Sequence, residues 1–264
     1  MKLNECSILI LSCDKNQKVV ELFLTFFERY FSDAAGEVFV GMERVDCLQH
    51  SCKVLTSNEG SWGARVKSYL DRINTDIVMI LLDDFLLEEP VDEHRLNQYV
   101  HQMQSDTSIA NIALADIYDN KNKNFSSEYL AIRPKKGWYL LNLQAGLWRR
   151  NVLYELLKDE ENPWQTEIYG SIRARAYSNY KFLCLKDDQY MPYKYNRGWL
   201  IVRGKWNRDE IERLQLQPYW EYLFDGKDIT HFGYKIPQPH LWNRIVTRLK
   251  ITRYQILSYF HIYL

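Results

Sequence analysis

One uninterrupted apolar run, Ile77-Val78-Met79-Ile80-Leu81-Leu82, ends in two adjacent acids, Asp83 and Asp84. A short apolar run bounded by polar residues is typical of a strand that is buried on both faces, as in the centre of a parallel sheet. Ligands of open α/β sheets bind at the carboxyl ends of the strands. The run therefore predicts a central strand that brings two carboxylates to a binding edge. The alternative is an acidic pair that opens a turn or caps the next helix.

The sequence on either side alternates between strand and helix patterns. Apolar runs predict strands over residues 7–12, 37–40 and 112–117, and helical spacing of apolar residues predicts helices over 16–31, 66–73 and 151–158. Strand and helix in alternation build a right-handed, mainly parallel sheet. We therefore expect the α/β fold class, with helices flanking a central sheet.

A turn and helix start precede the acidic strand. Residues 58–65 read Asn-Glu-Gly-Ser-Trp-Gly-Ala-Arg, and the apolar strand that ends in acids follows the next helix. This order resembles the nucleotide-sugar glycosyltransferases of the GT-A fold, especially those of the broad family 2 type, whose frame Asn58, Gly60, Ala64 and Arg65 match. The resemblance implies a GT-A, Rossmann-like catalytic domain over residues 1–228 that transfers a sugar from a nucleotide-diphosphate donor to a hydroxyl group.

The same resemblance assigns a donor site. Carboxylate oxygens suit Mn²⁺ or Mg²⁺ that bridges a diphosphate, and the family pattern makes Asp84 the metal ligand and Asp83 the contact to the donor sugar or ribose. An acid after the second strand meets the nucleobase in the family, and Glu43 or Asp46 lies in that region. Asn58 and Arg65, which match the family frame, are further expected donor-binding residues.

A leaving diphosphate also needs cations, and the segment 193–206 interleaves cations with aromatic residues. Sugar and phosphate sites use such mixtures. We select Arg203 and Lys205 from this segment as donor-binding candidates. The alternative is that this segment is an ordinary solvated surface.

An acceptor site is predicted around residues 139–150. A small-residue turn at Gly146 would allow the backbone to approach a sugar closely, while Gln144 and Trp148 offer a polar contact and an apolar platform. The alternative is a strand, a glycine turn and the start of a helix with solvated arginines.

The general base is predicted at Glu167. Pro163 is able to start a helix, and family 2 enzymes carry an acidic base in a segment at about this place in the chain. An inverting transfer needs a carboxylate within hydrogen-bond reach of the acceptor hydroxyl. The alternative is a glutamate that caps the helix and pairs with an arginine in the next turn.

Composition limits the classes of function. The 264 residues carry 34 basic and 34 acidic side chains, so no net charge attracts nucleic acid. The five cysteines lack CxxC spacing, which indicates reduced thiols rather than a disulfide framework or zinc site. The amino-terminal residues lack a signal-peptide pattern, and no apolar run reaches membrane-spanning length, so we expect a cytoplasmic protein.

The carboxyl-terminal segment, residues 229–264, differs from the rest. It contains five Lys and Arg residues and no acid, and residues 242–264 form a basic, aromatic-rich helical pattern. Such a helix suits the inner face of the plasma membrane and would bring the enzyme to a lipid-linked acceptor. A helix packed on the catalytic domain or across a dimer is the alternative.

The sequence-based hypothesis is therefore an inverting glycosyltransferase of surface-polysaccharide synthesis, of the capsule or O-antigen type, acting on a glycan or lipid-linked acceptor. Two other classes stay open. A nucleotidyltransferase would share the scaffold and the acids, but it should carry a glycine-rich phosphate loop that residues 11–17 lack. A catalytically inactive carbohydrate-binding or scaffold protein is also compatible with the motif Asp83-Asp84-Phe85, which differs from the Asp-x-Asp usual in the family.

Overall fold

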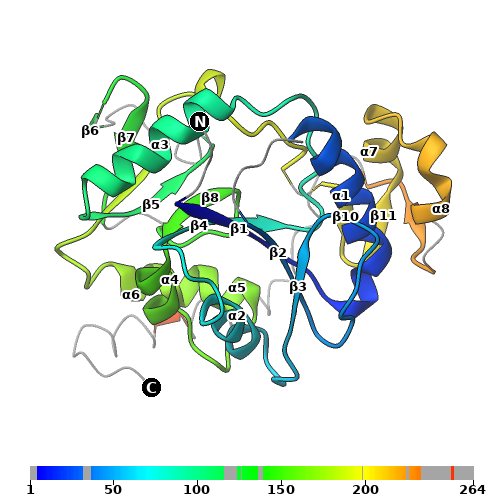
Figure 1. The fold of residues 1–264 in the computed structure, drawn as a ribbon, viewed down its shortest axis with the longest axis horizontal. Helices are drawn as coiled ribbons and strands as arrows, with labels where there is room; N and C mark the ends of the chain where they lie inside the picture. The colour runs from blue at the N-terminus through cyan, green and yellow to red at the C-terminus, as the bar shows by residue number, and fades with distance from the viewer. Residues whose placement is uncertain are drawn as a thin grey trace.

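The computed structural model describes residues 5–31, 37–115, 124–125, 127–135, 139–197, 199–223, 226–232 and 251–252. A nine-stranded sheet forms its centre (Figure 1). The order of strands across this sheet is β3 (Lys53–Thr56), β2 (Val38–Met42), β1 (Cys6–Leu11), β4 (Ile77–Leu82), β8 (Gly146–Arg149), β5 (Ile109–Ala113), β9 (Lys181–Leu185), β7 (Leu130–Ile132) and β6 (Asn124–Phe125). The expected α/β fold with helices around a mainly parallel sheet is confirmed.

Parallel pairing joins β3, β2, β1 and β4, and it also joins β5 and β9. Strand β8 runs antiparallel to both of its neighbours, β4 and β5. The register of β1 and β4 pairs Leu11 with Leu82, the last residue of each strand. The residues that follow these two strands therefore leave the sheet side by side.

Alternation along β1 and β4 divides the core into two layers. Ile8, Ile10, Met79 and Leu81 pack on one face of the sheet, whereas Leu9, Leu11, Val78 and Ile80 pack on the other. Side chains of a strand alternate between faces with a period of two, so a continuous apolar run is what a strand covered on both faces needs.

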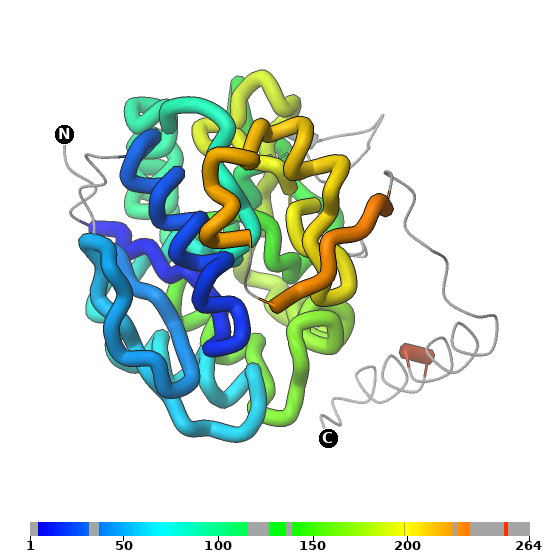
Figure 2. Tube along the Cα trace, turned by 90° about the vertical axis from the view of Figure 1, so that its right-hand side faces the viewer, coloured from blue at the N-terminus to red at the C-terminus, as the bar shows by residue number. Residues whose placement is uncertain are grey.

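Helices cover both faces. The helices α1 (Gln17–Tyr30), α3 (Glu93–Ser105), α7 (Arg208–Arg213) and α8 (Trp220–Leu223) contribute to one core layer, and α2 (Trp62–Leu70), α4 (Arg150–Leu156) and α6 (Ser171–Ala174) contribute to the other. Figure 2 shows α8 beside α1, and the ring of Tyr219, the residue before α8, lies 5.2 Å from the ring of Phe26 in α1. Short helical turns η1 (Asp14–Asn16), η2 (Thr166–Gly170), η3 (Asp188–Tyr190) and η4 (Gln217–Tyr219) and the helix α5 (Pro163–Gln165) complete the set of described helices.

A close contact explains one glycine of β2. A Cβ at Gly41 would lie 2.4 Å from the ring of Tyr69, so only glycine allows α2 to pack this closely. The Tyr69 hydroxyl donates a hydrogen bond to the carbonyl of Met42 at 2.6 Å. The contact fixes the carboxyl-terminal half of α2 next to the end of β2.

Several sequence-based boundaries need correction. The strand expected over 112–117 is β5, Ile109–Ala113, and the helix expected over 66–73 begins earlier, at Trp62. Strand β3 was not predicted, because it is short and half-exposed at the edge of the sheet. The helices expected over 16–31 and 151–158 are present as α1 and α4.

A small three-stranded sheet contains β10 (Ile201–Val202), β11 (Lys205–Asn207) and β12 (Ile229–Thr230). Because β12 pairs with β11, this sheet extends across the domain boundary expected after residue 228. The predicted basic helix, residues 242–264, lies outside the described residues except for 251–252. Within the described part of the chain, no helix has the length and apolarity needed to cross a membrane. All five cysteines are described, and none of them forms a disulfide bond.

Candidate functional site

Asp83 is fixed by residues that follow the neighbouring strand β1. Its backbone amide donates to the carbonyl of Leu11 at 3.3 Å. Its carboxylate oxygen Oδ2 accepts hydrogen bonds from Ser12 Oγ at 2.7 Å and from Asn16 Nδ2 at 3.0 Å. Burial raises the pKa of Asp83, and these hydrogen bonds act against that rise. The sequence prediction that this acid stands at the carboxyl edge of the sheet is confirmed.

Asp84 is half-buried beside Asp83 and differs from it in its partners. Among the described residues, only its own backbone amide donates a hydrogen bond to its carboxylate. Burial, followed by the charge of Asp83, raises the pKa of Asp84 to about 8. A carboxylate left with open acceptor positions next to a second acid is a chemically suitable cation ligand.

The described residues contain no cluster of three or more His, Cys, Asp or Glu side chains suited to a metal ion. A dedicated protein cage for a metal is therefore absent from this part of the chain. Mg²⁺ and Mn²⁺ do not require one, because they bind through one or two carboxylates and complete their shells with water and substrate phosphates. The donor set of Asp84 and its neighbour fits that mode of binding.

Glu43 and Arg65 meet at the same edge of the sheet. Arg65 Nη2 lies 3.2 Å from Glu43 Oε1, and Glu43 Oε2 accepts a hydrogen bond from the backbone amide of Asp14 at 3.2 Å. Arg65 Nη1 also donates to the carbonyl of Glu59 at 3.2 Å, in the turn where Asn58 is exposed. The fold thus brings the predicted residues Asn58, Glu43 and Arg65 together near the end of β2.

A lysine that the sequence reasoning missed reaches the acidic pair. Lys227 Nζ donates to the carbonyl of Lys15 at 2.9 Å, next to Asn16, which binds Asp83. The positive charge of Lys227 is close enough to oppose the burial-induced rise of the Asp83 pKa. No motif surrounds Lys227 in the sequence, so only the folded chain identifies it.

The two predicted cations lie in the small sheet. Lys205 Nζ forms an ion pair with Asp228 Oδ2 at 2.9 Å, and both side chains are exposed. Arg203 is exposed in the turn between β10 and β11, with a positive φ of 55°. The ion-pair partner of Lys205, Asp228, directly follows Lys227 in the sequence.

Glu167 lies in the π-helical turn η2, directly after α5. Its Oε1 accepts a hydrogen bond from the backbone amide of Leu143 at 2.8 Å. Burial raises the pKa of Glu167, and the bond from Leu143 lowers it by a smaller amount. Single π-helical turns frequently occur at functional sites. Glu167 is thus a half-buried carboxylate held against the loop of residues 139–145.

Gln144 connects this loop to the neighbourhood of the acidic pair. Its Oε1 accepts a hydrogen bond from the hydroxyl of Tyr195 at 2.8 Å. The Tyr195 ring lies 4.7 Å from the ring of Phe85, the residue after Asp84. Burial raises the pKa of Tyr195, and the charge of Asp84 adds to that rise. Tyr195 therefore stands between Asp84 and Gln144.

Two of the predicted acceptor residues belong to the core instead. Trp148 is 1 % exposed, and its ring packs edge-on against Phe182 with centroids 6.3 Å apart. Gly146 begins β8, where a Cβ would lie 3.3 Å from the carbonyl of Ile112. Both residues are enclosed because β8 is inserted between β4 and β5, so the acceptor role expected for Trp148 is wrong and Gly146 serves strand packing.

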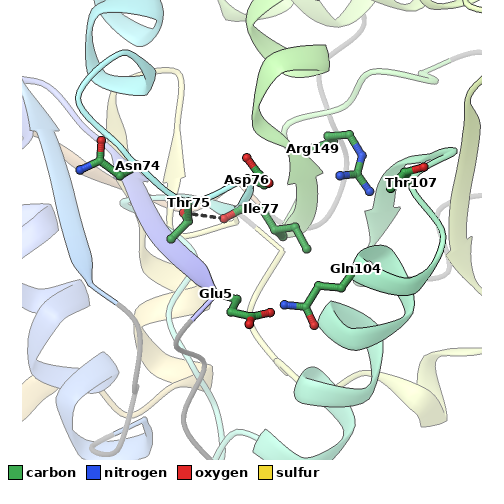
Figure 3. A pocket seen from close by; sticks show the side chains of 8 residues that line it. All are labelled: Glu5, Asn74, Thr75, Asp76, Ile77, Gln104, Thr107 and Arg149. Atoms are coloured by element: carbon green, nitrogen blue, oxygen red, sulfur yellow. Dashed lines mark hydrogen bonds between the residues drawn. The ribbon is translucent and has the colours of Figure 1, made fainter.

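A separate hollow lies at the opposite end of β4. This pocket of about 490 Å³ surrounds Thr75, Asp76 and Arg149, as Figure 3 shows. The guanidinium of Arg149 is directed to the carbonyls of Met103, at 2.7 Å, and Ile109, at 3.2 Å. Its charge therefore serves the packing of α3 against β8, and the pocket lies away from the acidic pair.

No protein-family profile and no curated protein matches the sequence. Similar solved structures include S. aureus TarS 1–349 in complex with UDP-GlcNAc, with a TM-score of 0.46 and 15% identity over 70% of this chain and 55% of that chain. Glucosyl-3-phosphoglycerate synthase from Mycobacterium tuberculosis, in complex with Mn²⁺, UDP and phosphoglyceric acid, has a TM-score of 0.42 and 10% identity over 67% of this chain and 66% of that chain.

These two neighbours are glycosyltransferases of the GT-A type. Another neighbour is CMP:2-keto-3-deoxy-manno-octonic acid synthetase complexed with CTP, with a TM-score of 0.42 and 14% identity over 69% of this chain and 88% of that chain. Without its ligands, TarS 1–349 is matched over 57% of its length. All these TM-scores lie below 0.5.

Proposed function

We propose that the protein is a metal-assisted glycosyltransferase that moves a sugar from a nucleotide-diphosphate donor to an acceptor hydroxyl. The observation that supports this most directly is the acidic pair after β4. Asp83 is held by Ser12 and Asn16, whereas Asp84 keeps open acceptor positions and has a pKa raised to about 8 by burial and by Asp83. An acid kept in this state at the binding edge of an α/β sheet favours a cation-binding role.

The donor would lie across the ends of β1, β2 and β4. Asp84, with Asp83 beside it, would hold Mn²⁺ or Mg²⁺, which would neutralise charge on the diphosphate. Lys227 supplies a second positive charge next to Asn16 and Asp83. By the resemblance, Glu43 and Arg65 would contact the nucleotide, and Arg203 and Lys205 stay candidates for the outer part of the donor site.

The transfer assigned to this site is a single displacement. The acceptor oxygen forms a bond to the anomeric carbon while the bond from that carbon to the diphosphate oxygen breaks, and the bonding pair leaves with the nucleotide diphosphate. Glu167 takes the proton from the acceptor hydroxyl. Its raised pKa makes it a stronger base than an exposed glutamate.

The acceptor would lie over the loop 139–145 and the helix start at α5. Gln144 is half-exposed there and is oriented by Tyr195. Trp164 is 73% exposed and stands three residues before Glu167, so it replaces Trp148 as the apolar platform. The finer assignment to surface-polysaccharide synthesis is proposed from the sequence resemblance. A lipid-linked acceptor, with residues 242–264 at the membrane, is proposed from the basic and aromatic-rich composition of that segment.

A screen of nucleoside diphosphates tests this proposal. Thermal unfolding is followed with UDP, GDP, ADP and CDP, each with and without Mn²⁺. Binding to the folded state at about 100 times the dissociation constant stabilises a protein by about 2.7 kcal/mol, so we expect an increase in Tm for at least one nucleotide that requires Mn²⁺. Stabilisation by none of the four nucleotides, or an increase in Tm that is the same with and without Mn²⁺, would contradict the proposed donor site.

Metal affinity should also depend on pH. Because Asp84 has a pKa of about 8, a proton competes with the metal below that pH. We expect the apparent affinity for Mn²⁺, measured by calorimetry with the chosen nucleotide present, to rise between pH 6 and pH 8 by up to about tenfold per unit. A constant affinity over this range would show that Asp84 is not the ligand.

Lys227→Ala should weaken nucleotide-diphosphate binding more than Lys205→Ala does. A hydrogen bond to a charged group contributes about 1.5–3 kcal/mol, so we expect a loss of about 10- to 100-fold in affinity. The matched variant Lys205→Ala removes an exposed ion pair with Asp228 and should have a small effect. Calorimetric titration with the diphosphate and with the corresponding nucleoside separates phosphate contacts from base contacts. Equal losses in the two variants would place the diphosphate at the small sheet instead.

A further inference from the structure

A buried ion pair between Glu161 and Arg173 lies next to the turn that carries the candidate base, Glu167. Arg173 Nη1 lies 2.6 Å from Glu161 Oε1, and Arg173 Nη2 lies 2.6 Å from Glu161 Oε2. The guanidinium also donates from Nε, at 3.0 Å, and from Nη2, at 2.6 Å, to the carbonyl of Leu156 at the end of α4. The Glu161 and Arg173 side chains are 9% and 5% exposed. This geometry is a two-pronged ion pair that is almost entirely buried.

Glu161 also holds the segments on either side of it. Its carbonyl accepts a hydrogen bond from the amide of Gly63 in α2 at 3.1 Å. Its Oε2 accepts one from Thr166 Oγ1 at 3.3 Å, and Thr166 is fully buried immediately before Glu167. One side chain and its backbone thus connect the helix that carries Arg65 to the turn that carries Glu167.

The approach of α2 to this point is unusually close. A Cβ at Gly63 would lie 2.0 Å from the carbonyl of Lys158, so a larger residue cannot occupy this position without moving the backbone. On the other side of η2, a Cβ at Gly170 would lie 2.7 Å from Leu141 Cδ1. The π-helical turn is therefore packed tightly between the Glu161 segment and the loop 139–145.

Stability alone is a weak explanation for such a pair, because apolar residues of similar volume often replace buried ion pairs without loss. We propose that Glu161 and Arg173 are positioning residues that fix Glu167 against Leu143 and set its place relative to α2. This inference rests on the proposed function for its catalytic meaning. Its structural part, the position of the Glu167 carboxylate, is measurable without a substrate.

The test combines three changes at the pair. Glu161→Gln leaves the charge of Arg173 without its partner, Thr166→Val removes only the hydroxyl contact, and the double variant Glu161→Leu/Arg173→Met replaces the pair by apolar side chains. The control is Glu210→Gln, which disrupts another buried glutamate that is paired with arginine, in α7. Hydrogen exchange of the Leu143 amide, whose hydrogen bond goes to Glu167, is measured in the whole protein together with Tm.

We expect the Leu143 amide to exchange at least about tenfold faster in Glu161→Gln and Thr166→Val. In both variants the hydrogen bond from this amide to Glu167 should open more often. The double variant should recover Tm relative to Glu161→Gln and keep the faster exchange. Glu210→Gln should lower Tm with the Leu143 exchange unchanged. Recovery of both Tm and Leu143 protection in the double variant would overturn the proposal. If the double variant does not fold, native exchange in Thr166→Val would overturn it.

Turnover gives the second measurement once a donor is identified. If Glu161 and Arg173 position Glu167, kcat should fall in Thr166→Val and in the double variant. The affinity for the nucleotide diphosphate should stay at the native value. Because the hydrogen-exchange result needs no donor, absence of transfer with every donor would count against the proposed function alone. Native kcat in a variant with fast Leu143 exchange would overturn the positioning role.

Discussion

Asp84→Asn should abolish the Mn²⁺-dependent stabilisation by a nucleoside diphosphate and, at the same time, make the metal-free protein more stable. Asparagine keeps the shape of the side chain but removes the negative charge that a cation requires. Turnover should fall to background, because the diphosphate would lose its principal counter-charge. A substitution of a residue that only supports the fold would lower stability together with activity. Loss of activity with a gain in stability therefore indicates a functional role for Asp84.

The gain in stability follows from the sign of the pKa shift. Burial and Asp83 raise the pKa of Asp84 from 3.8 to about 8, so the folded state holds a proton that the unfolded state releases between these values. The free energy of unfolding is therefore highest, as far as Asp84 is concerned, below about pH 4, where the proton is bound in both states. It falls as the pH rises from about 4 through 8, because the unfolded state then releases its proton, whereas the folded state must keep the proton or bury a charged Asp84. Asp84→Asn removes this dependence, and we expect a gain of at least about 1 kcal/mol at pH 8, since one pKa unit corresponds to about 1.4 kcal/mol.

Thermal unfolding of both proteins at pH 5 and pH 8, with and without Mn²⁺ and nucleotide, measures these effects. Asp106→Asn serves as the control. Asp106 is a distant acid whose pKa is lowered to about 2, chiefly by hydrogen bonds from Ser108 and Lys181. That variant should lose stability and keep the response to metal. An Asp84→Asn protein that still responds to Mn²⁺ would remove Asp84 from the metal site.

Local sequence was sufficient to predict the acidic edge of the site. The run Ile77–Leu82 is buried on both faces, so the residues after it had to leave the sheet where β1 also ends. The turn before α2 likewise placed Arg65 and Asn58 near the end of β2. In these cases the signal and the consequence lie within a few residues of each other in the chain.

The errors arose where the role of a residue depends on distant segments. Trp148 follows a glycine and precedes arginines, which is a reasonable surface pattern, yet β8 is inserted between β4 and β5 and pairs Trp148 with Val78 and Asn111. Lys227 lies far from Asp83 in the sequence and approaches it only through the small sheet. Neither the inserted antiparallel strand nor this return of the chain has a local sequence signal.

Glu167 was predicted from the resemblance, and the structure gives it surroundings that a capping residue would not need. The helix start at α5 is already capped by Asn162, whose side chain accepts from the amide of Gln165 at 3.0 Å. The Glu167 carboxylate instead contacts the loop 139–145 through Leu143. The alternative of a simple helix cap therefore loses its structural basis, and the catalytic role stays a prediction.

Glu167→Gln should lower kcat by about 10²–10⁴-fold, which is the usual contribution of one general base. The amide oxygen of glutamine is able to accept the same hydrogen bond from Leu143, so the loop should keep its position and the nucleotide diphosphate should bind with unchanged affinity. Steady-state kinetics and calorimetric titration measure the two quantities. Glu155→Gln, which changes an exposed glutamate on α4, is the matched control and should leave both unchanged.

The pH profile separates a base from a structural glutamate. Because burial raises the pKa of Glu167, the native enzyme should lose kcat as the pH falls through a value above that of an ordinary glutamate, where the carboxylate becomes protonated and accepts no further proton. In Glu167→Gln the residual kcat should lack this acidic limb. An acidic limb that persists in the variant, or nucleotide binding that is lost together with kcat, would show that another carboxylate is the base and that Glu167 holds the loop in place.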